Sequence, residues 1–96
     1  MAVLRHPGWT TATVTVRYFA GAQAAAGVPE EAVTLAAPAT LARLVEELVQ
    51  RHGEGLARVL AAASFIVDEV AAAGVDREAT LDDGTRVDVL PPFAGG

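Results

Sequence analysis

The sequence predicts an α+β fold, a roll in which one β-sheet packs on one main helix. Residues 13–19 and 85–90 alternate apolar with polar or charged side chains, which is the period-2 pattern of half-buried strands. Between them, residues 41–49 place apolar side chains at helical spacing. A strand hairpin, a helix that crosses over and a closing strand fit a roll in which one sheet face covers the helix. We expect the opposite sheet face to stay open to partners.

The length of the chain predicts a single domain. Its 96 residues allow one hydrophobic core. We expect three parts: a loosely ordered arm over residues 1–11, the folded domain over residues 12–90, and a flexible tail over residues 91–96.

Composition argues against several classes of function. The formal net charge is −5, which disfavours nucleic acid as a partner and favours a basic protein surface. No apolar run approaches the roughly 20 residues that span a bilayer, so we expect no membrane partner. Arg5, His6, Pro7 and Gly8 stand where a secretory signal would need an apolar stretch, and the chain has no Cys. We therefore expect a cytoplasmic protein without a disulfide, a Cys-based zinc site or a cysteine nucleophile.

Residues 13–19 form the most regular strand pattern, because β-branched and aromatic residues fill the segment. The side chains expected to face the core are Val14, Val16 and Tyr18. The other face is polar except for Phe19, which is an apolar side chain on the side predicted to face solvent. The Ala- and Gly-rich residues 20–29 predict a loop with a helical turn, and residues 31–35 predict a second strand that closes a hairpin.

The main helix has clear start and stop signals. Thr40 stands at the N-cap position, and Gly53 supplies the stop. Glu47 and Arg51 have the i, i+4 spacing of a stabilising ion pair. The apolar stripe of this helix is predicted to pack in the core. Its members are Leu41, Leu44, Val45, Leu48 and Val49.

After this helix, residues 55–63 form a weaker, Ala-rich helical pattern. Residues 64–70 predict a third strand that runs into a turn at Asp68 and Glu69, and residues 70–73 predict a short return strand. Asp83 and Gly84 then predict a turn that leads into the final strand, residues 85–90.

The last six residues carry the most specific chemical hint. Pro91 and Pro92 remove two backbone donors, so the strand must stop there. Gly95 and Gly96 have no Cβ atom, so this end of the chain is slender enough for a narrow channel. The carboxylate of Gly96 is a poor electrophile until one oxygen becomes a leaving group. A substrate of an ATP-using activating enzyme is therefore predicted.

Other candidate chemistry is weak. His6 lies in the predicted arm and His52 at a helix end, where a cation suits the helix dipole, so we expect no metal site and no catalytic histidine. The single Ser64 lies inside a predicted strand, and no Ser-His-Asp arrangement is credible.

Several of these segments together resemble the small, sulfur-carrying subunit of molybdopterin synthase. They are Val16-Arg17-Tyr18-Phe19-Ala20, Thr40-Leu41, Val67-Asp68-Glu69, Asp83-Gly84 and above all Leu90-Pro91-Pro92-Phe93-Ala94-Gly95-Gly96. The similarity covers residues 13–96. It implies the ubiquitin-like β-grasp fold, a mixed sheet with the first and last strands parallel and central. The chain departs from the family at Asp68, where the family usually has Asn, and at Glu69, where Gly or Gln is common.

The resemblance also implies a function, that of a sulfur carrier in molybdenum cofactor biosynthesis. An activating enzyme would adenylate Gly96 with Mg-ATP, and a persulfide donor would convert the adenylate into a thiocarboxylate. The tail would then enter the large synthase subunit and deliver sulfur to cyclic pyranopterin monophosphate. The chain would be the non-catalytic, sulfur-donating subunit and would bind no cofactor itself. Gly95 and Ala94 would give the tail its reach, and Phe93, Pro92 and Pro91 would aim it.

If the first and last strands are neighbours, alternation brings further residues together. Arg17 and Asp88 are expected to pair, and Phe19 and Leu90 to form an exposed apolar patch at the base of the tail, which is typical of a docking surface. Alternatively, Phe19 is covered by the loop after it or by Trp9. Two other functions also remain: a sulfur carrier for thiamin, cysteine or tRNA thiolation, and a non-catalytic ubiquitin-like interaction module.

Overall fold

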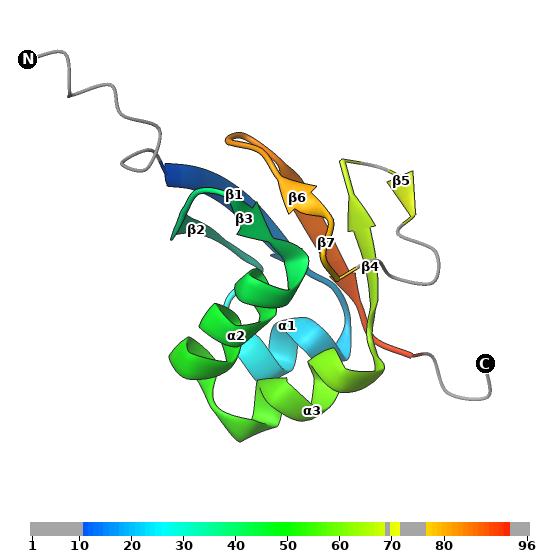
Figure 1. The fold of residues 1–96 in the computed structure, drawn as a ribbon. Helices are drawn as coiled ribbons and strands as arrows, with labels where there is room; N and C mark the ends of the chain where they lie inside the picture. The colour runs from blue at the N-terminus through cyan, green and yellow to red at the C-terminus, as the bar shows by residue number, and fades with distance from the viewer. Residues whose placement is uncertain (1–10, 69, 72–76, 93–96) are drawn as a thin grey trace, which may run out of the picture.

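The computed structural model describes residues 11–68, 70–71 and 77–92 (Figure 1). A mixed five-stranded sheet, in the order β2-β1-β7-β4-β5, forms the body of this part of the chain. Its strands are β1 (Thr11–Tyr18), β2 (Glu30–Ala36), β4 (Ser64–Val67), β5 (Val70–Ala71) and β7 (Arg86–Leu90). A second sheet of two strands pairs β3 (Ala39–Thr40) with β6 (Thr80–Leu81).

The first and last strands lie side by side and run parallel. The register places Thr15 opposite Arg86 and Tyr18 opposite Val89. β2 pairs antiparallel with β1 on one side, and β4 pairs antiparallel with β7 on the other. This confirms the predicted hairpin and the predicted central, parallel pair.

Three helices cover one face of the sheet: α1 (Gly21–Ala26), α2 (Leu41–His52) and α3 (Glu54–Ala62) (Figure 1). The predicted main helix is α2, and the Thr40 hydroxyl accepts a hydrogen bond from the Arg43 amide at 3.1 Å, as an N-cap should. Gly53 has φ 85°, which favours glycine, and it separates α2 from α3. The weaker helical pattern after the main helix is therefore a separate helix, α3, and α2 does not cover the sheet alone.

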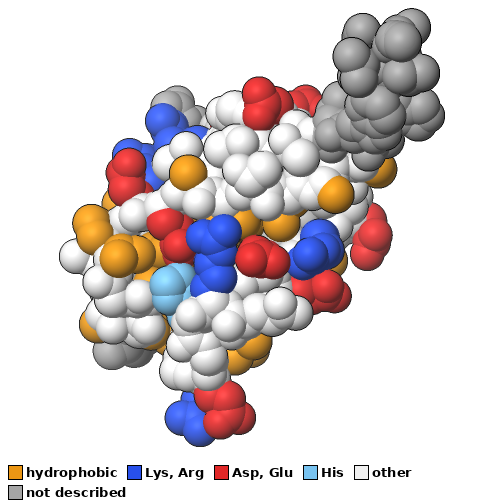
Figure 2. All heavy atoms as spheres, turned by 90° about the vertical axis from the view of Figure 1, so that its left-hand side faces the viewer, with side chains coloured by type: hydrophobic (Ala, Val, Ile, Leu, Met, Phe, Trp, Pro, Cys, Tyr) orange, Lys and Arg blue, Asp and Glu red, His pale blue; other side chains and the backbone are white. Residues whose placement is uncertain are grey.

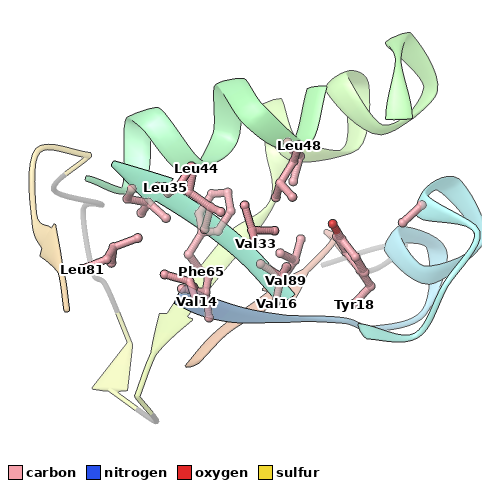
Figure 3. Close-up of a cluster of buried hydrophobic side chains, with 14 of the residues drawn as sticks. Val14, Val16, Tyr18, Val33, Leu35, Leu44, Leu48, Phe65, Leu81 and Val89 are labelled. Atoms are coloured by element: carbon pink, nitrogen blue, oxygen red, sulfur yellow. The ribbon is translucent and has the colours of Figure 1, made fainter. Parts of the chain in front are cut away.

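The core fills the space between the helices and the inner face of the sheet, the face that they cover. Leu44 and Leu48 point from α2 toward Val33 and Val16 of the sheet (Figure 3). The buried apolar side chains that β1, β4 and β7 contribute are Ala12, Val14, Val16, Tyr18, Phe65, Val87 and Val89. Alternation along β1 thus buries the face that the sequence predicted to be buried.

Some boundaries differ from expectation. β3 and β6 were not predicted, because two-residue strands carry no periodic pattern. Thr11, which we assigned to the arm, is the first residue of β1 and lies opposite Ala36. Residues 1–10, the rest of that arm, lie outside the described residues, as do residues 72 and 73 of the predicted return strand. Among the described residues, no helix combines the length and apolar character that crossing a bilayer requires.

Candidate functional site

The candidate site lies where β7 ends and the chain continues into residues 91–96. The Phe19 amide donates a hydrogen bond to the Val89 carbonyl at 3.1 Å, which extends the parallel pairing one residue beyond β1. Leu90 follows Val89 and lies opposite Ser64 of β4. The strand that leads into the last six residues therefore ends in the middle of the sheet, between β1 and β4, and not at an edge.

Three apolar side chains that are partly exposed lie near this exit on the sheet face away from the helices. Phe19 is 38% exposed and is the one exposed large hydrophobic side chain among the described residues. Leu90 and Ile66 are partly exposed, and alternation places both on the same sheet face as Phe19. We call Phe19, Leu90 and Ile66 the outer patch. The loop over residues 20–29 leaves Phe19 exposed, and Trp9 lies outside the described residues.

A two-pronged ion pair lies beside the outer patch. Arg17 donates from Nε to Asp88 Oδ1 at 2.8 Å and from Nη2 to Oδ2 at 3.0 Å, which confirms the predicted pairing. These hydrogen bonds hold the pKa of the Asp88 carboxyl below its ordinary value. The Arg17 guanidinium carbon also lies 5.4 Å from the centre of the Phe19 ring. The charged pair and the exposed ring are thus one connected group.

The structure places only part of the predicted tail. Pro91 is buried and Pro92 is exposed, so the chain leaves the core between these two residues. Phe93, Ala94, Gly95 and Gly96 lie outside the described residues. Their role in binding and in sulfur chemistry stays a prediction.

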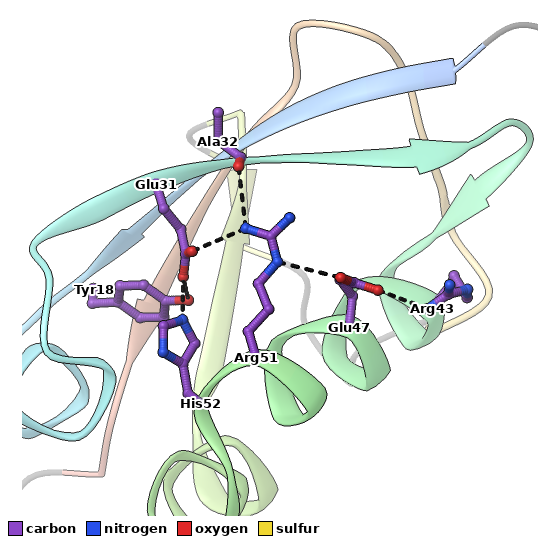
Figure 4. A network of polar contacts seen from close by, with 7 residues as sticks. All are labelled: Tyr18, Glu31, Ala32, Arg43, Glu47, Arg51 and His52. Atoms are coloured by element: carbon purple, nitrogen blue, oxygen red, sulfur yellow. Dashed lines mark hydrogen bonds and ion pairs between the residues drawn. The ribbon is translucent and has the colours of Figure 1, made fainter.

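A second polar cluster lies on the helix-covered side of the sheet (Figure 4). The Tyr18 hydroxyl donates to Glu31 Oε2 at 2.6 Å, and His52 Nε2 lies 2.6 Å from the same oxygen. Arg51 Nη1 donates to Glu31 Oε1 at 3.2 Å and to the Ala32 carbonyl at 3.4 Å. Arg51 also reaches Glu47 at 3.3 Å, the predicted i, i+4 pair.

This cluster has the features of a structural anchor. Burial is the main cause that raises the pKa of Tyr18, and the hydrogen bond to Glu31 raises it further. Burial also acts to raise the pKa of Glu31, but hydrogen bonds from Tyr18 and His52 prevail and hold it below its ordinary value. Charged side chains and a histidine gather over the side of the molecule that β2 and α2 form (Figure 2). Within the described residues, no three His, Asp or Glu side chains form a candidate metal site.

Sequence reasoning missed two local features near the site. Ile66 belongs to the outer patch, and alternation in residues 64–67 could have placed it beside Asp88. Asp68 has φ 49°, its amide donates to the Arg86 carbonyl at 2.8 Å, and its Oδ1 accepts from the Arg86 amide at 2.8 Å. Because Asp tolerates this conformation better than most residues, the departure from the family's usual Asn keeps the turn.

The parallel central strands, the helices on one face and the terminal segment that leaves mid-sheet define the β-grasp, ubiquitin-like class of small carrier proteins. The model of the ThiS family matches residues 16–96. The chain belongs to the ThiS family, one of the families of ubiquitin-like sulfur carriers.

Solved structures agree with this assignment. The molybdopterin converting factor subunit 1 described from Pyrococcus furiosus is 31% identical, with a TM-score of 0.75 over 85% of this chain and 99% of that chain. A complex of subunits 1 and 2 of the molybdopterin-converting factor from Helicobacter pylori contains a match with 26% identity and a TM-score of 0.59, over 88% of this chain and 99% of that chain.

The small archaeal modifier protein 1 from Methanosarcina acetivorans shares the fold at 20% identity, with a TM-score of 0.76 over 91% of this chain and 99% of that chain. Comparison with curated protein sequences finds no match.

Proposed function

We propose that the chain is the sulfur carrier of molybdopterin synthase and that it works in molybdenum cofactor biosynthesis. The P. furiosus relative that carries the name molybdopterin converting factor subunit 1 supports this pathway at 31% identity. The family match extends to residue 96 and therefore includes the terminal glycines. The single observation that carries the proposal is the bond from the Phe19 amide to the Val89 carbonyl, which places the exposed Phe19 at the end of β7, where the chain leads into residues 91–96.

The chemistry proposed for Gly96 has three steps. An activating enzyme transfers AMP from Mg-ATP to the carboxylate, and pyrophosphate leaves. The terminal sulfur of a protein persulfide then attacks the acyl carbon and displaces AMP. A thiol then attacks the donor protein's sulfur in this acyl disulfide, which forms a new disulfide with the donor and releases the thiocarboxylate. All catalytic groups belong to the partners, so this chain contributes a carboxyl carbon and the means to present it.

In the same proposal, the outer patch docks on the large synthase subunit while the tail enters that subunit's active site. The H. pylori relative forms a complex of subunits 1 and 2, which supports such a partner. Phe and Arg are both enriched in protein interfaces relative to the rest of the surface. Phe19 and Leu90 bind outside the channel. Pro91, Pro92 and Phe93 aim the tail, and Ala94 and Gly95 give it the reach to enter.

Intact mass spectrometry tests the proposal. The purified chain is incubated with its activating enzyme, Mg-ATP and a persulfide donor. We expect the mass to rise by one sulfur-for-oxygen exchange, and a variant without Gly95 and Gly96 to remain unchanged. Glu46→Gln, on the exposed side of α2, is the matched control and should react like the wild type. An unmodified wild-type chain, or undiminished cofactor synthesis by the truncated variant in a reconstituted system, would refute the proposal.

The same assay separates the pathways. Parallel incubations contain the activating enzyme of molybdenum cofactor, thiamin, cysteine or tRNA thiolation. We expect efficient conversion only with the first. Conversion only with another enzyme would assign the carrier to that pathway, and stable attachment to other proteins without a thiocarboxylate would indicate an interaction module or a modifier.

A further inference from the structure

The residue that follows Phe19 has an unusual backbone. Ala20 has φ 49° and ψ −127°. A residue with a Cβ atom rarely adopts a positive φ, so glycine is the residue usually found in this conformation. Strained residues of this kind persist where the surrounding structure holds them, and they cluster at functional sites. Ala20 lies directly beside the outer patch, so its conformation calls for a physical explanation.

The strained residue turns the chain from β1 into α1 and fixes the backbone of Phe19. The Ala22 amide donates to the Phe19 carbonyl at 2.9 Å, and the Gln23 amide donates to the Ala20 carbonyl at 3.0 Å. On the other side, the Phe19 amide donates to the Val89 carbonyl at 3.1 Å. Both backbone polar groups of Phe19 are therefore hydrogen-bonded, which fixes the direction in which its side chain leaves the backbone.

Arg17 fixes the ring from the same sheet face. Its guanidinium carbon lies 5.4 Å from the ring centre. Since both oxygens of Asp88 hold this guanidinium, the cation cannot swing away from the ring without breaking two hydrogen bonds. The ring is thus supported on one side and exposed on the other.

We infer that Ala20 and Arg17 are positioning residues that hold Phe19 exposed beside Leu90 before any partner binds. This inference rests on the proposed docking function of the outer patch. A side chain that is already ordered loses less freedom on binding, and the gain is about 2- to 12-fold in affinity for one side chain. The attraction between the Arg17 guanidinium and the Phe19 ring also strengthens once a partner excludes water from the pair.

Ala20→Gly separates positioning from stability. Glycine relieves the strain at positive φ but gives the segment more freedom, so we expect an unchanged or higher thermal midpoint. Affinity for the large synthase subunit of the same organism should fall about 2- to 12-fold. Ala42→Gly, in the first turn of α2, is the matched control. Its midpoint should fall because glycine is a poor helix former, while its affinity should stay unchanged.

Arg17→Lys tests the second positioning residue. Lysine keeps the charge but cannot hold Asp88 with a planar two-pronged group or stack on the ring in the same way. We expect a similar loss of affinity and greater motion of the Phe19 ring in NMR relaxation. Arg43→Lys, whose partner is Glu47 on α2, is the matched control and should bind like the wild type.

The outcomes distinguish this inference from the function on which it rests. If Phe19→Ser binds the large subunit as tightly as the wild type, the docking function of the outer patch is wrong. If Phe19→Ser weakens binding while Ala20→Gly and Arg17→Lys bind normally, the positioning inference alone is wrong. A thermal midpoint for Ala20→Gly well below that of the wild type would also overturn it, because Ala20 would then be a stabilising residue without strain.

Discussion

The two faces of the sheet use neighbouring aromatic residues in opposite ways. Tyr18 is 2% exposed, packs in the core, and donates its hydroxyl hydrogen bond to Glu31. Phe19, the next residue, is 38% exposed and has the Arg17 guanidinium beside its ring. The residue with a hydroxyl group is buried, and the purely apolar residue faces solvent.

Hydrophobicity alone would give the reverse arrangement. Tyr18 is buried because Glu31 and the nearby α2 supply a partner for its hydroxyl, so burial leaves no unsatisfied polar group. Phe19 has no such requirement and gains free energy when another surface covers it. The difference indicates that the inner face stabilises the fold and leaves the outer face available for the binding role proposed above. The predictions below test this separation.

The largest effect is expected in the core. Leu44→Ala removes a fully buried side chain that α2 points at the sheet, and the free energy of unfolding should fall by about 2–5 kcal/mol. Urea denaturation measures this loss. Glu46→Ala, on the exposed side of the same helix, should stay within about 0.5 kcal/mol of the wild type. A loss below about 1 kcal/mol for Leu44→Ala would contradict the assignment of the core.

The outer patch should show the opposite behaviour. Replacement of both Phe19 and Leu90 by Ser should lower affinity for the large synthase subunit at least about 30-fold, because truncation of a hot spot costs about 2 kcal/mol or more. The free energy of unfolding should change by less than about 1 kcal/mol. Isothermal titration calorimetry measures the affinity. The control is Thr34→Ser, a substitution in β2 opposite Thr13, on the same sheet face but away from the outer patch. Undiminished binding would remove the docking function from this patch.

The Glu31 anchor should matter for stability and depend on pH. Glu31→Gln removes the charged acceptor that Tyr18, His52 and Arg51 share, so stability at pH 7 should fall by about 1.5–3 kcal/mol. Since the folded-state pKa of Glu31 lies below its ordinary value of 4.5, its contribution is fully present above that value and is lost as pH falls through the folded-state pKa.

The denaturation curves of wild type and Glu31→Gln should therefore converge on acidification. Glu30→Gln, on the neighbouring exposed residue, should change stability at pH 7 by less than about 0.5 kcal/mol. A constant difference between wild type and Glu31→Gln from neutral to acidic pH would be the unexpected result.

The smallest effect on stability is expected for the Arg17–Asp88 pair. Arg17 has a side-chain exposure of 37%, so water screens the pair and Arg17→Ala should cost about 0.2–1 kcal/mol. The pKa of Asp88 should lie below its ordinary value of 3.8 in the wild type and rise in Arg17→Ala. Carboxyl NMR titration measures both values, and equal pKa values would show that Arg17 does not hold Asp88.

The elements that could be predicted from the sequence are those with a local pattern. Alternation gave β1 and β7, and the Thr40 cap and apolar stripe gave α2. Alternation also gave the Arg17–Asp88 pair once the resemblance had made the two strands neighbours.

What escaped prediction depends on long-range geometry or on residues without a distinctive preference. The Tyr18–Glu31–His52 cluster requires the register of β2 and the position of the end of α2, which no local pattern encodes. Ala20 carries no signal for positive φ, because alanine ordinarily favours helical conformations. The long-range bond from Phe19 to Val89, together with the local bonds that start α1, holds its conformation.

The central position of β7 would have a mechanical consequence if other proteins handle the end of the chain, as the proposed function requires. β7 is hydrogen-bonded to β1 on one side and to β4 on the other. A pull along β7 therefore strains the hydrogen bonds to both strands at the same time. At a sheet edge, the bonds could instead be peeled away one after another. Under the proposed function, a partner that pulled on the terminus would therefore meet resistance from both neighbouring strands of the sheet at once.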